Sequence, residues 1–513
     1  MTATSTLKLA GLLLVAAMVV LWGRFATAAQ AKGQKQPNIV LITTDDQPLT
    51  SFQQGWMPNV FQHLAGSGTV FKDAVVNEPL CAPSRSTLLT GQYAHNQGVL
   101  TNDDAYSNLV DPRDVLPVWL QRAGYRTGHF GKWLHGYESD HGYAPAPGWD
   151  RWVTLGDKRR YYDYEVSVDG EPVKKGSKPN DHVTAVTSRA ATRFVSQNVK
   201  SKEPLFMQVD YFAPHESGRN ADPRCAGAPE PVERDIGAAK GQKTPRGPSF
   251  NEADVSDKPY YERLGEMTEG DIKTLDRRYR CIAESLLGVD RGIGTLVDRF
   301  REAHELRNTT FVFMTDNGIS LGEHRVRDGK SRPWEESIRT PLVIRMPRSA
   351  GETRDVVRTQ VAGIDIAPTL LDLAGADPCD AGGCRVMDGR SLVGPATGDS
   401  TGFADRAVLV ELAETPTQEK RAWACSFQAL RTSDEIIVEA TRIPDPDTKI
   451  CKDEKAYEFY DLASDPFELD NRINGSITTD GPKILSAYQR LQALRECSGI
   501  EGRDPPSAGG YCE

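Results

Sequence analysis

A cysteine followed four residues later by an arginine is the first feature of this sequence that could do chemistry. The pair is Cys81 and Arg85. Pro83 suits the first turn of a helix and Gly91 suits its end. We therefore expect Cys81 just ahead of a short helix, near the positive end of its dipole, with Arg85 one turn further on. This arrangement is typical of a site that handles electrophiles or binds anions. A half-buried loop cysteine is the competing interpretation.

Two pairs of oxygen-bearing side chains follow two continuous apolar runs. Asp45-Asp46 follows the first run and Asp316-Asn317 follows the second. Such runs are typical of strands buried in a parallel sheet, where ligands bind beyond the carboxyl ends of the strands. Three carboxylates brought together require a cation, and oxygen ligands favour Ca²⁺ or Mg²⁺ over zinc. Either pair alone would be interpreted as an ordinary turn.

Several basic side chains accompany these acids. Lys132 and His215 each follow a predicted strand, and Lys330 comes shortly after the second oxygen-bearing pair. Around a bound cation, basic side chains make a receptor for a tetrahedral oxyanion, and Cys81 is then the candidate nucleophile. The basic candidates are Arg85, Lys132, His135, His215, His324 and Lys330.

The N-terminus predicts export. Lys8 precedes an apolar run at 9–22, and the Ala-Thr-Ala at 26–28 offers a cleavage site. The run is shorter than the ~18–20 residues that a membrane span needs, so we expect residues 1–28 to be a signal peptide. A secreted or extracytoplasmic protein without a stable membrane span follows. An uncleaved membrane tether is the less expected alternative.

The nine cysteines suit an exported chain. Setting Cys81 aside leaves an even number, which we expect to form disulfides. The odd cysteine is the one beside Arg85, which favours a function for it. Proximity along the chain suggests, without fixing the connectivity, the pairs Cys379–Cys384, Cys425–Cys451 and Cys497–Cys512, which leaves Cys225–Cys281 as the remainder.

The formal net charge of −10 argues against a nucleic-acid partner, because phosphates attract basic surfaces. An anionic small substrate is compatible with this charge where positive side chains gather locally. Apolar and charged fractions of 39% and 26% are those of a globular protein that can bury a large core.

Strands that alternate with helices predict an α/β fold, with a large central, mostly parallel sheet flanked by helices. After about residue 400, short strands and a helix near 483–495 predict a smaller C-terminal subdomain containing an antiparallel sheet. We therefore expect a large domain over 37–400 and the subdomain over 401–513. The Gly- and Pro-rich stretch at 216–258 is interpreted as a long surface excursion that lines a cleft.

The cysteine stretch Cys81-Ala82-Pro83-Ser84-Arg85 resembles the signature Cys-x-Pro-Ser-Arg of the type I, formylglycine-dependent sulfatases, in the alkaline phosphatase-like superfamily. The stretch 124–133 is similar to the second signature of that family. The likeness runs from about 37 to 471 and is strongest to the N-acetylglucosamine-6-sulfatase group. Further matches in the order of the family are Asp45-Asp46, Ala213-Pro214-His215, Thr315-Asp316-Asn317-Gly318, 330–341 and 457–471.

The resemblance implies that 37–400 is a sulfatase catalytic domain and that a formylglycine-generating enzyme oxidises Cys81 to formylglycine. One hydroxyl of the hydrated aldehyde would attack the sulfur of a sulfate ester, and the second would then expel sulfate. It also implies one Ca²⁺ per chain. The implied calcium ligands are Asp45, Asp46, Asp316, Asn317 and the modified Cys81.

The resemblance assigns roles to the basic residues as well. Arg85 would hold the formylglycine hydrate, and Lys132 and Lys330 would bind sulfate. His215 would contact sulfate or protonate the leaving oxygen. His135 is the candidate base on the hydrate, but it stands one residue later than the histidine of many family members, which leaves its role open. The sixth basic candidate, a histidine at 324, is a weaker candidate for the substrate pocket.

The function expected from these residues is hydrolysis of sulfate esters on sugars such as N-acetylglucosamine 6-sulfate units, or on aryl sulfates. One alternative is a phosphodiester or phosphonate monoester hydrolase on the same fold, because a diol nucleophile and a metal also serve phosphorus. The other is a non-catalytic binder of sulfated glycans in which Cys81 stays a thiol.

Overall fold

The computed structural model describes residues 35–103, 105–217, 224–225, 227–380, 383–413, 424–473, 477 and 481–513. The expected signal peptide, residues 1–28, lies outside these residues. Within the described ranges, no helix has both the length and the apolar character needed to cross a membrane.

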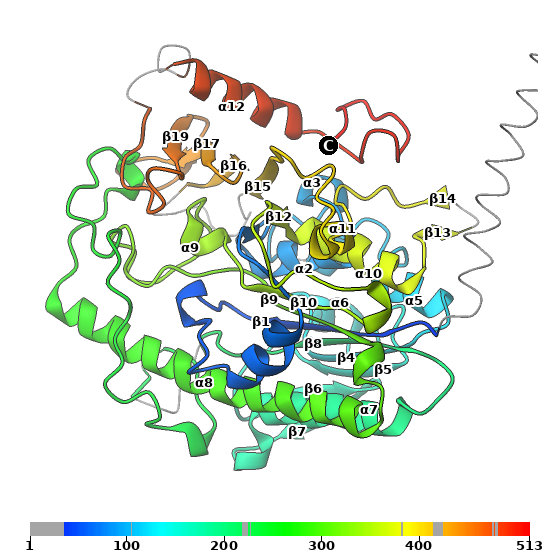
Figure 1. Ribbon diagram of the computed structural model, residues 1–513. Coiled ribbons are helices and arrows are strands. Elements are labelled where there is room, and N and C mark those ends of the chain that lie inside the picture. Colours follow the sequence, from blue (N-terminus) through cyan, green and yellow to red (C-terminus); the bar gives the residue numbers. More distant parts are fainter. Residues whose placement is uncertain are drawn as a thin grey trace, which may run out of the picture.

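A mixed sheet forms the centre of the molecule, flanked by helices on both faces (Figure 1). The strands β9, β1, β8, β4 and β5 run parallel to their neighbours, and antiparallel strands extend the sheet on both sides. This confirms the predicted α/β fold with a mostly parallel core. In spatial order the strands are β11 (Val356–Val357), β2 (Thr69–Phe71), β10 (Leu342–Arg345), β9 (Thr309–Thr315), β1 (Asn38–Thr44), β8 (Leu205–Asp210), β4 (Arg126–Lys132), β5 (Arg151–Leu155), β6 (Tyr164–Val168) and β7 (Glu171–Lys175).

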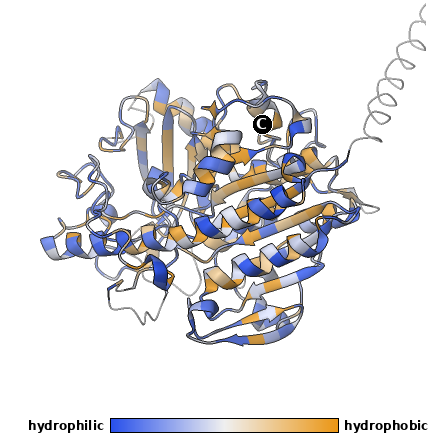
Figure 2. Cartoon of the chain, turned by 60° about the horizontal axis from the view of Figure 1, so that its bottom comes forward, coloured by the Kyte–Doolittle hydropathy of each residue, from blue (hydrophilic) through white to orange (hydrophobic). Residues whose placement is uncertain are grey.

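The apolar residues of β1 alternate between the two faces of the sheet. Val40 and Ile42 pack with helices α7 (Val183–Asn198) and α8 (Glu269–Glu302). Ile39 and Leu41 pack on the opposite face with α2 (Cys81–Thr90), α5 (Leu116–Arg122) and α10 (Ile366–Ala374). Strands buried on both faces explain the continuous apolar runs of the sequence. Figure 2 shows these apolar strands beneath helices whose outer surfaces are largely hydrophilic.

A second, antiparallel sheet lies beside the first, with helix α12 (Pro482–Leu494) packed against it (Figure 1). It confirms the predicted C-terminal antiparallel sheet. Its strands are β15 (Val408–Leu412), β16 (Ser426–Arg431), β17 (Glu435–Pro444), β18 (Cys451–Lys452) and β19 (Ala456–Asp461). The remaining short elements are β3 (Ala74–Val75), β12 (Val361–Ala362), β13 (Cys379–Asp380), β14 (Gly383–Cys384), α3 (Ala94–Gln97), α4 (Ala105–Asn108), α6 (Tyr137–His141), α9 (Glu335–Ile338) and α11 (Val393–Thr397).

The disulfides follow sequence proximity. All four suggested pairs are bonded, and Cys81 is the free cysteine, buried in the interior. The pairs are Cys225–Cys281, Cys379–Cys384, Cys425–Cys451 and Cys497–Cys512.

Candidate active site

The two oxygen-bearing pairs meet at one edge of the central sheet. Strands β1 and β9 are parallel neighbours in a register that places Thr44 opposite Thr315, so both strands end at the same level. The backbone N–H of Asp46 donates to Oδ1 of Asp316 over 3.2 Å. The amide Nδ2 of Asn317 donates to Oδ1 of Asp46 over 2.6 Å. The expectation that residues following parallel strands meet at the carboxyl edge of the sheet is therefore confirmed for these two pairs.

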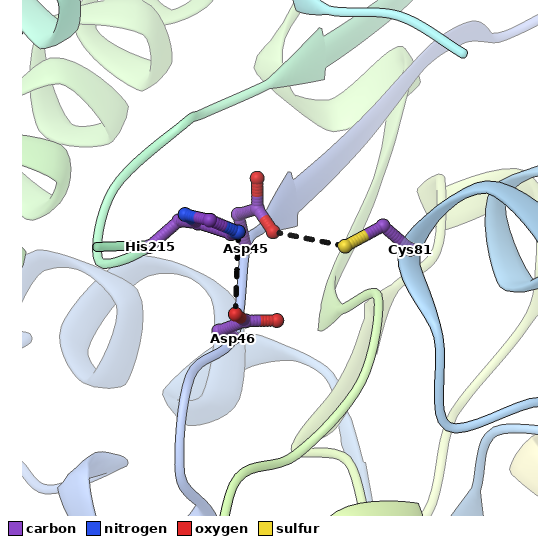
Figure 3. A group of neighbouring side chains, drawn as sticks. All are labelled: Asp45, Asp46, Cys81 and His215. Atoms are coloured by element: carbon purple, nitrogen blue, oxygen red, sulfur yellow. Dashed lines mark hydrogen bonds and ion pairs between the residues drawn. The ribbon is translucent and has the colours of Figure 1, made fainter. Parts of the chain in front are cut away.

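Cys81 faces this group from helix α2. It is the first residue of that helix rather than the residue just ahead of it, and Gly91 ends the helix with a positive φ of 68°. The Cys81 Sγ lies 3.7 Å from Oδ1 of Asp45 (Figure 3). One turn further along, Nε of Arg85 donates to Oδ2 of Asp316 over 2.9 Å. The arginine is 2% exposed, so this ion pair is shielded from water.

Two lysines reach the carboxylates from other directions. The Nζ of Lys132, at the end of β4, lies 2.5 Å from Oδ2 of Asp45, at an angle that leaves both atoms without a hydrogen bond. The preceding Gly131 has a φ of 116°, and a Cβ there would lie 1.8 Å from the backbone oxygen of Asp210. Only glycine therefore lets β4 approach β8 closely enough to present Lys132 at this point.

Lys330 makes more contacts with the group than Lys132 does. Its Nζ lies 2.5 Å from Oδ1 of Asp46, 2.8 Å from Sγ of Cys81 and 3.4 Å from Oδ1 of Asn317. Burial lowers the pKa of Lys330, but Asp46 and the other acids outweigh burial and raise it well above its ordinary value. Lys330 is therefore cationic at neutral pH.

Two histidines near the site have opposite proton affinities. Nε2 of His215 lies 3.5 Å from Oδ2 of Asp46 (Figure 3). Burial lowers the pKa of His215, but Asp45 and Asp46 outweigh it and raise the pKa to about 9. Burial, together with Arg159 and a neighbouring lysine, holds the pKa of His135 well below its ordinary value. The first is therefore an acid at neutral pH and the second is a base, a division typical of general acid–base pairs.

The positive side chains also set the charge of the acids and the thiol. Burial raises the pKa of Asp45, but Lys132 and His215 outweigh it and hold the pKa far below its usual range. Burial raises the pKa of Cys81 as well, and Lys132 and Lys330 again outweigh it, so the pKa is lowered. The opposite balance holds at Asp316, where burial and Asp45 keep the pKa raised. The site thus holds more negative charge than its own lysines and arginine fully stabilise.

The donor atoms of this site could hold a cation. One ligand atom each from Asp45, Asp46, Cys81 and His215 lies within 4.8 Å of the others. The group shares three members with the predicted ligand set and adds a histidine. Two of its four donor atoms are carboxylate oxygens, and Oδ2 of Asp45 accepts no hydrogen bond. This donor set suits a hard divalent cation.

His324 lies in a separate buried group. Its Nδ1 is 2.7 Å from Oε2 of Glu252 and its Nε2 is 3.6 Å from Oε2 of Glu336. The side chain is fully buried. It lies apart from the strand-end acids, and its role in a substrate pocket stays a prediction.

Two residues of the site were not predicted. Asp210 ends β8, next to β1, and lies 3.6 Å from the Arg85 guanidinium and 2.5 Å from the Thr43 hydroxyl. The strand-end rule that found the other acids applies to it equally. Arg159 lies between β5 and β6 with a buried guanidinium whose Nε has no hydrogen-bond partner. Burial lowers its pKa, and nearby Asp45 opposes that shift. No sequence pattern marks this loop arginine.

Two family models match the chain. The Sulfatase model matches residues 37–376, more than half of the sequence. A second model, N-sulphoglucosamine sulphohydrolase, C-terminal, matches residues 322–432.

The curated relatives of this chain are named as sulfatases and differ in length. An extracellular sulfatase Sulf-1 homologue of Caenorhabditis elegans is 34% identical over 367 residues, covering 70% of this chain and 49% of that protein, so the chain spans about half of that relative's length. An arylsulfatase of Volvox carteri is 31% identical over 88% of this chain and 73% of its own length. The human N-acetylglucosamine-6-sulfatase is 28% identical over 95% of this chain and 90% of its own length.

Solved structures share the fold. A protein in complex with its substrate D-glucosamine-2-N,6-O-disulfate superposes with a TM-score of 0.68 at 23% identity, covering 89% of this chain and 97% of that chain. The phosphonate monoester hydrolase of Agrobacterium radiobacter superposes with a TM-score of 0.67 at 20% identity, covering 93% and 99%. At these identities the two structures show only that the fold is shared. The family model, together with the Volvox relative, shows that this chain belongs to the sulfatase family.

Proposed function

We propose that this chain hydrolyses sulfate esters of sugars, with N-acetylglucosamine 6-sulfate units as the substrate class. The observation that carries the proposal is the convergence of the free Cys81 with Asp45, Asp46 and Lys330 at the carboxyl edge of the sheet. Relatives named N-acetylglucosamine-6-sulfatase that align with almost the whole chain support the choice of sugar.

Cys81 would become formylglycine through a formylglycine-generating enzyme, and the hydrated aldehyde would supply the nucleophilic hydroxyl. Three features support this assignment. Cys81 is the free cysteine among four disulfides, it starts helix α2, and Lys330 and Asp45 contact its sulfur. Its position also places the reacting atom beside the positive side chains that a sulfate ester requires.

The residues present fit a calcium ion. Asp45, Asp46, Asp316, Asn317 and the modified Cys81 would hold it through oxygen atoms, which are the ligands that Ca²⁺ prefers. The raised pKa of Asp316 indicates negative charge that a cation would compensate. A half-turn of the Asn317 side-chain amide would present its oxygen in place of the nitrogen that donates to Asp46. When bound, the ion would polarise the sulfate group.

The other side chains would orient the substrate and move protons. Arg85 is fixed by Asp316 and would hold the formylglycine hydrate. Lys132 and Lys330 would bind the sulfate oxygens. His215, protonated because of its raised pKa, would give a proton to the leaving sugar oxygen, and His135, neutral because of its lowered pKa, would take one from the hydrate.

An exported location fits this proposal. The signal-like N-terminus predicts secretion, and two relatives are named extracellular sulfatases. The disulfides of the structure require an oxidising compartment.

A second candidate, hydrolysis of phosphonate monoesters or phosphodiesters, has one observation in its favour, the phosphonate monoester hydrolase of the same fold. The test compares kcat/KM of one preparation on an aryl sulfate, an aryl phosphodiester and a phosphonate monoester. We expect the sulfate to be the best substrate of the three. A large preference for either phosphorus substrate would overturn the proposed function. An absence of turnover on all three would favour the non-catalytic glycan binder.

A further inference from the structure

A long groove runs between helices α7 and α8 on the outer face of the sheet. Its volume is about 1020 Å³. The floor is shallow because Gly288 and Gly292 of α8 pass close to α7. A Cβ on Gly292 would lie 2.1 Å from the Ser188 hydroxyl and 2.6 Å from that of Tyr211. Small hydroxyl side chains, Thr192 and Thr295 among them, line the rest of the floor.

Arginines dominate the rims of this groove, whereas glutamate 233 is the one acid among the lining residues. The lining arginines are Arg189, Arg193, Arg234, Arg291 and Arg299. This concentration of positive charge stands out on a chain with a net charge of −10.

Most of this charge is open to a ligand. Arg291 pairs with Asp235, and Arg299 pairs with Glu302 over 2.6 Å. The remaining three rim arginines are exposed and, within the part of the chain that the structure describes, form no ion pair with an acid. On α7, Arg189 and Arg193 stand one turn apart, about 6 Å along the helix axis. The two paired arginines on α8 stand about 12 Å apart. The rims thus present repeated positive charges along a line.

One end of the groove is linked to the candidate active site through the buried Tyr161. The lining residues Pro179 and Asn180 directly precede α7, whose first N–H, from Val183, donates to the Tyr161 carbonyl over 3.0 Å. The Tyr161 hydroxyl in turn donates to the backbone oxygen of His215 over 2.7 Å. Helices α7 and α8 each lead into a parallel strand, β8 and β9, so their N-terminal ends lie at the carboxyl edge of the sheet.

We propose that the groove between α7 and α8 binds a chain of a sulfated polysaccharide, whose sulfate groups pair with the rim arginines while one end of the chain extends to the active site. The proposal rests on the proposed sulfatase function. A polyanion is selected by rows of arginine, which bind oxyanions through several donors at once. A sugar chain is favoured over an apolar ligand because hydroxyl side chains and glycine form the floor.

The test separates polymer binding from turnover. The double variant Arg189→Glu/Arg193→Glu reverses two exposed charges on one rim, and Arg348→Glu/Arg358→Glu makes the same change in charge at the opposite edge of the sheet. Binding of heparin is measured in a Cys81→Ala background, so that no sulfate is removed. Sulfate release from heparin fragments and from a small aryl sulfate is measured with Cys81 in place.

We expect the groove variant to bind heparin about tenfold more weakly and to lose kcat/KM on long fragments to a similar degree. Turnover of the aryl sulfate stays unchanged, as do all properties of the control variant. Equal heparin binding by the groove and control variants would overturn the proposal. It would also be overturned if the groove variant lost as much affinity for single-stranded DNA of matched charge as it loses for heparin. Failure of the unaltered protein to cleave the aryl sulfate would instead overturn the proposed function, and the heparin measurement would still decide the groove.

Discussion

Two groups of buried acids lie at the two ends of the segment 316–336, and they are neutralised in different ways. The strand-edge group surrounds the candidate active site and consists of Asp45, Asp46, Asp210 and Asp316. The glutamate group surrounds His324 and consists of Glu252, Glu262, Glu323, Glu336 and Glu468.

Basic side chains neutralise the strand-edge group. Burial raises the pKa of Asp46, but Lys330 and His215 outweigh it and lower the pKa. Asp210 behaves in the same way beside a histidine and Arg85. These acids stay ionised at neutral pH, which is the state that binds a metal ion. Asp316 differs in the direction of its pKa shift, because burial and Asp45 raise it.

Protons neutralise most of the glutamate group. Burial raises the pKa of Glu468 well above its ordinary value, and two neighbouring glutamates raise it further. Burial likewise raises the pKa of Glu262 and of Glu323 to about 7. Glu336 has a lowered pKa, because His324 outweighs burial there.

The difference shows why metal-like geometry alone does not identify a site. His324, Glu336 and Glu468 also place three ligand atoms within 4.8 Å of one another. A protonated imidazole and a protonated carboxyl group cannot act as metal ligands. The strand-edge group has the same geometry, and its His215 is also protonated. Its lysines keep Asp45 and Asp46 ionised, so carboxylate ligands remain there.

Replacing the candidate nucleophile has the largest expected effect. Cys81→Ala should lower turnover roughly 10⁴-fold or more, because the chemical step loses its nucleophile. The fold should persist, with the midpoint of thermal unfolding close to that of the unaltered protein. Sulfate release and thermal unfolding are measured side by side. Wild-type turnover by Cys81→Ala would show that the chemical step does not depend on Cys81, so the strand-edge group would no longer differ from the glutamate group by holding a nucleophile.

Calcium removal should affect the strand-edge group alone. A chelator should abolish turnover and lower the midpoint of thermal unfolding, and added Ca²⁺ should restore both, since saturation at about 100 times the Kd stabilises by about 2.7 kcal/mol. Asp46→Asn should lose this calcium-dependent rise in the midpoint. Glu336→Gln, the matched amide variant in the glutamate group, should keep it. The opposite pattern would place the ion in the glutamate group.

The protonated His324 should make stability depend on pH. Burial lowers its pKa, but Glu252 and Glu336 outweigh burial and raise it to about 10 from 6.5. Because the folded-state pKa is the higher one, the stabilisation is complete below pH 6.5 and is lost as the pH rises through 10.

The variant His324→Gln checks this dependence. Urea unfolding should show the unaltered protein to be more stable by about 2–4 kcal/mol near pH 6, with the difference shrinking towards pH 10. A difference that stays constant over this range would mean that His324 is neutral in the folded protein.

The smallest effect is expected at Glu468. The pKa of its carboxyl is raised well above the ordinary value, which favours the protonated form, so Glu468→Gln should cost less than about 1 kcal/mol in the free energy of unfolding. Glutamine can still accept the hydrogen bond that the backbone N–H of Glu335 donates. Glu468→Ala is the control and should cost more, because it leaves that N–H unpaired. A loss of several kcal/mol in the glutamine variant would show that the carboxylate is ionised.

The sequence was sufficient where a local pattern determines the position in space. Asp45 and Asp316 were placed together correctly because a buried parallel strand delivers the residue after it to the carboxyl edge. Three disulfide pairs were also predicted because near neighbours in sequence proved to be near neighbours in space, and the fourth followed as the remaining pair.

Other features depend on contacts that no local pattern encodes. Arg159 reaches the site from a loop, and the glutamate group gathers residues as distant as Glu252 and Glu468. The segment 57–66, which has helical spacing, is only partly regular, with a π-helical turn from 60 to 64 followed by a 3₁₀ turn. There Asp290 of α8 accepts the N–H groups at 59 and 60, a tertiary contact that the helical spacing does not reveal.

The central claim is that Cys81 is converted into the nucleophile of a sulfatase. The direct test is the mass of the peptide containing Cys81, taken from protein made in a host with a formylglycine-generating enzyme and assayed for sulfate release in the same preparation. The account predicts the lower mass of formylglycine, with turnover proportional to the converted fraction across preparations. Full turnover by protein whose Cys81 peptide carries only the unmodified thiol would contradict it.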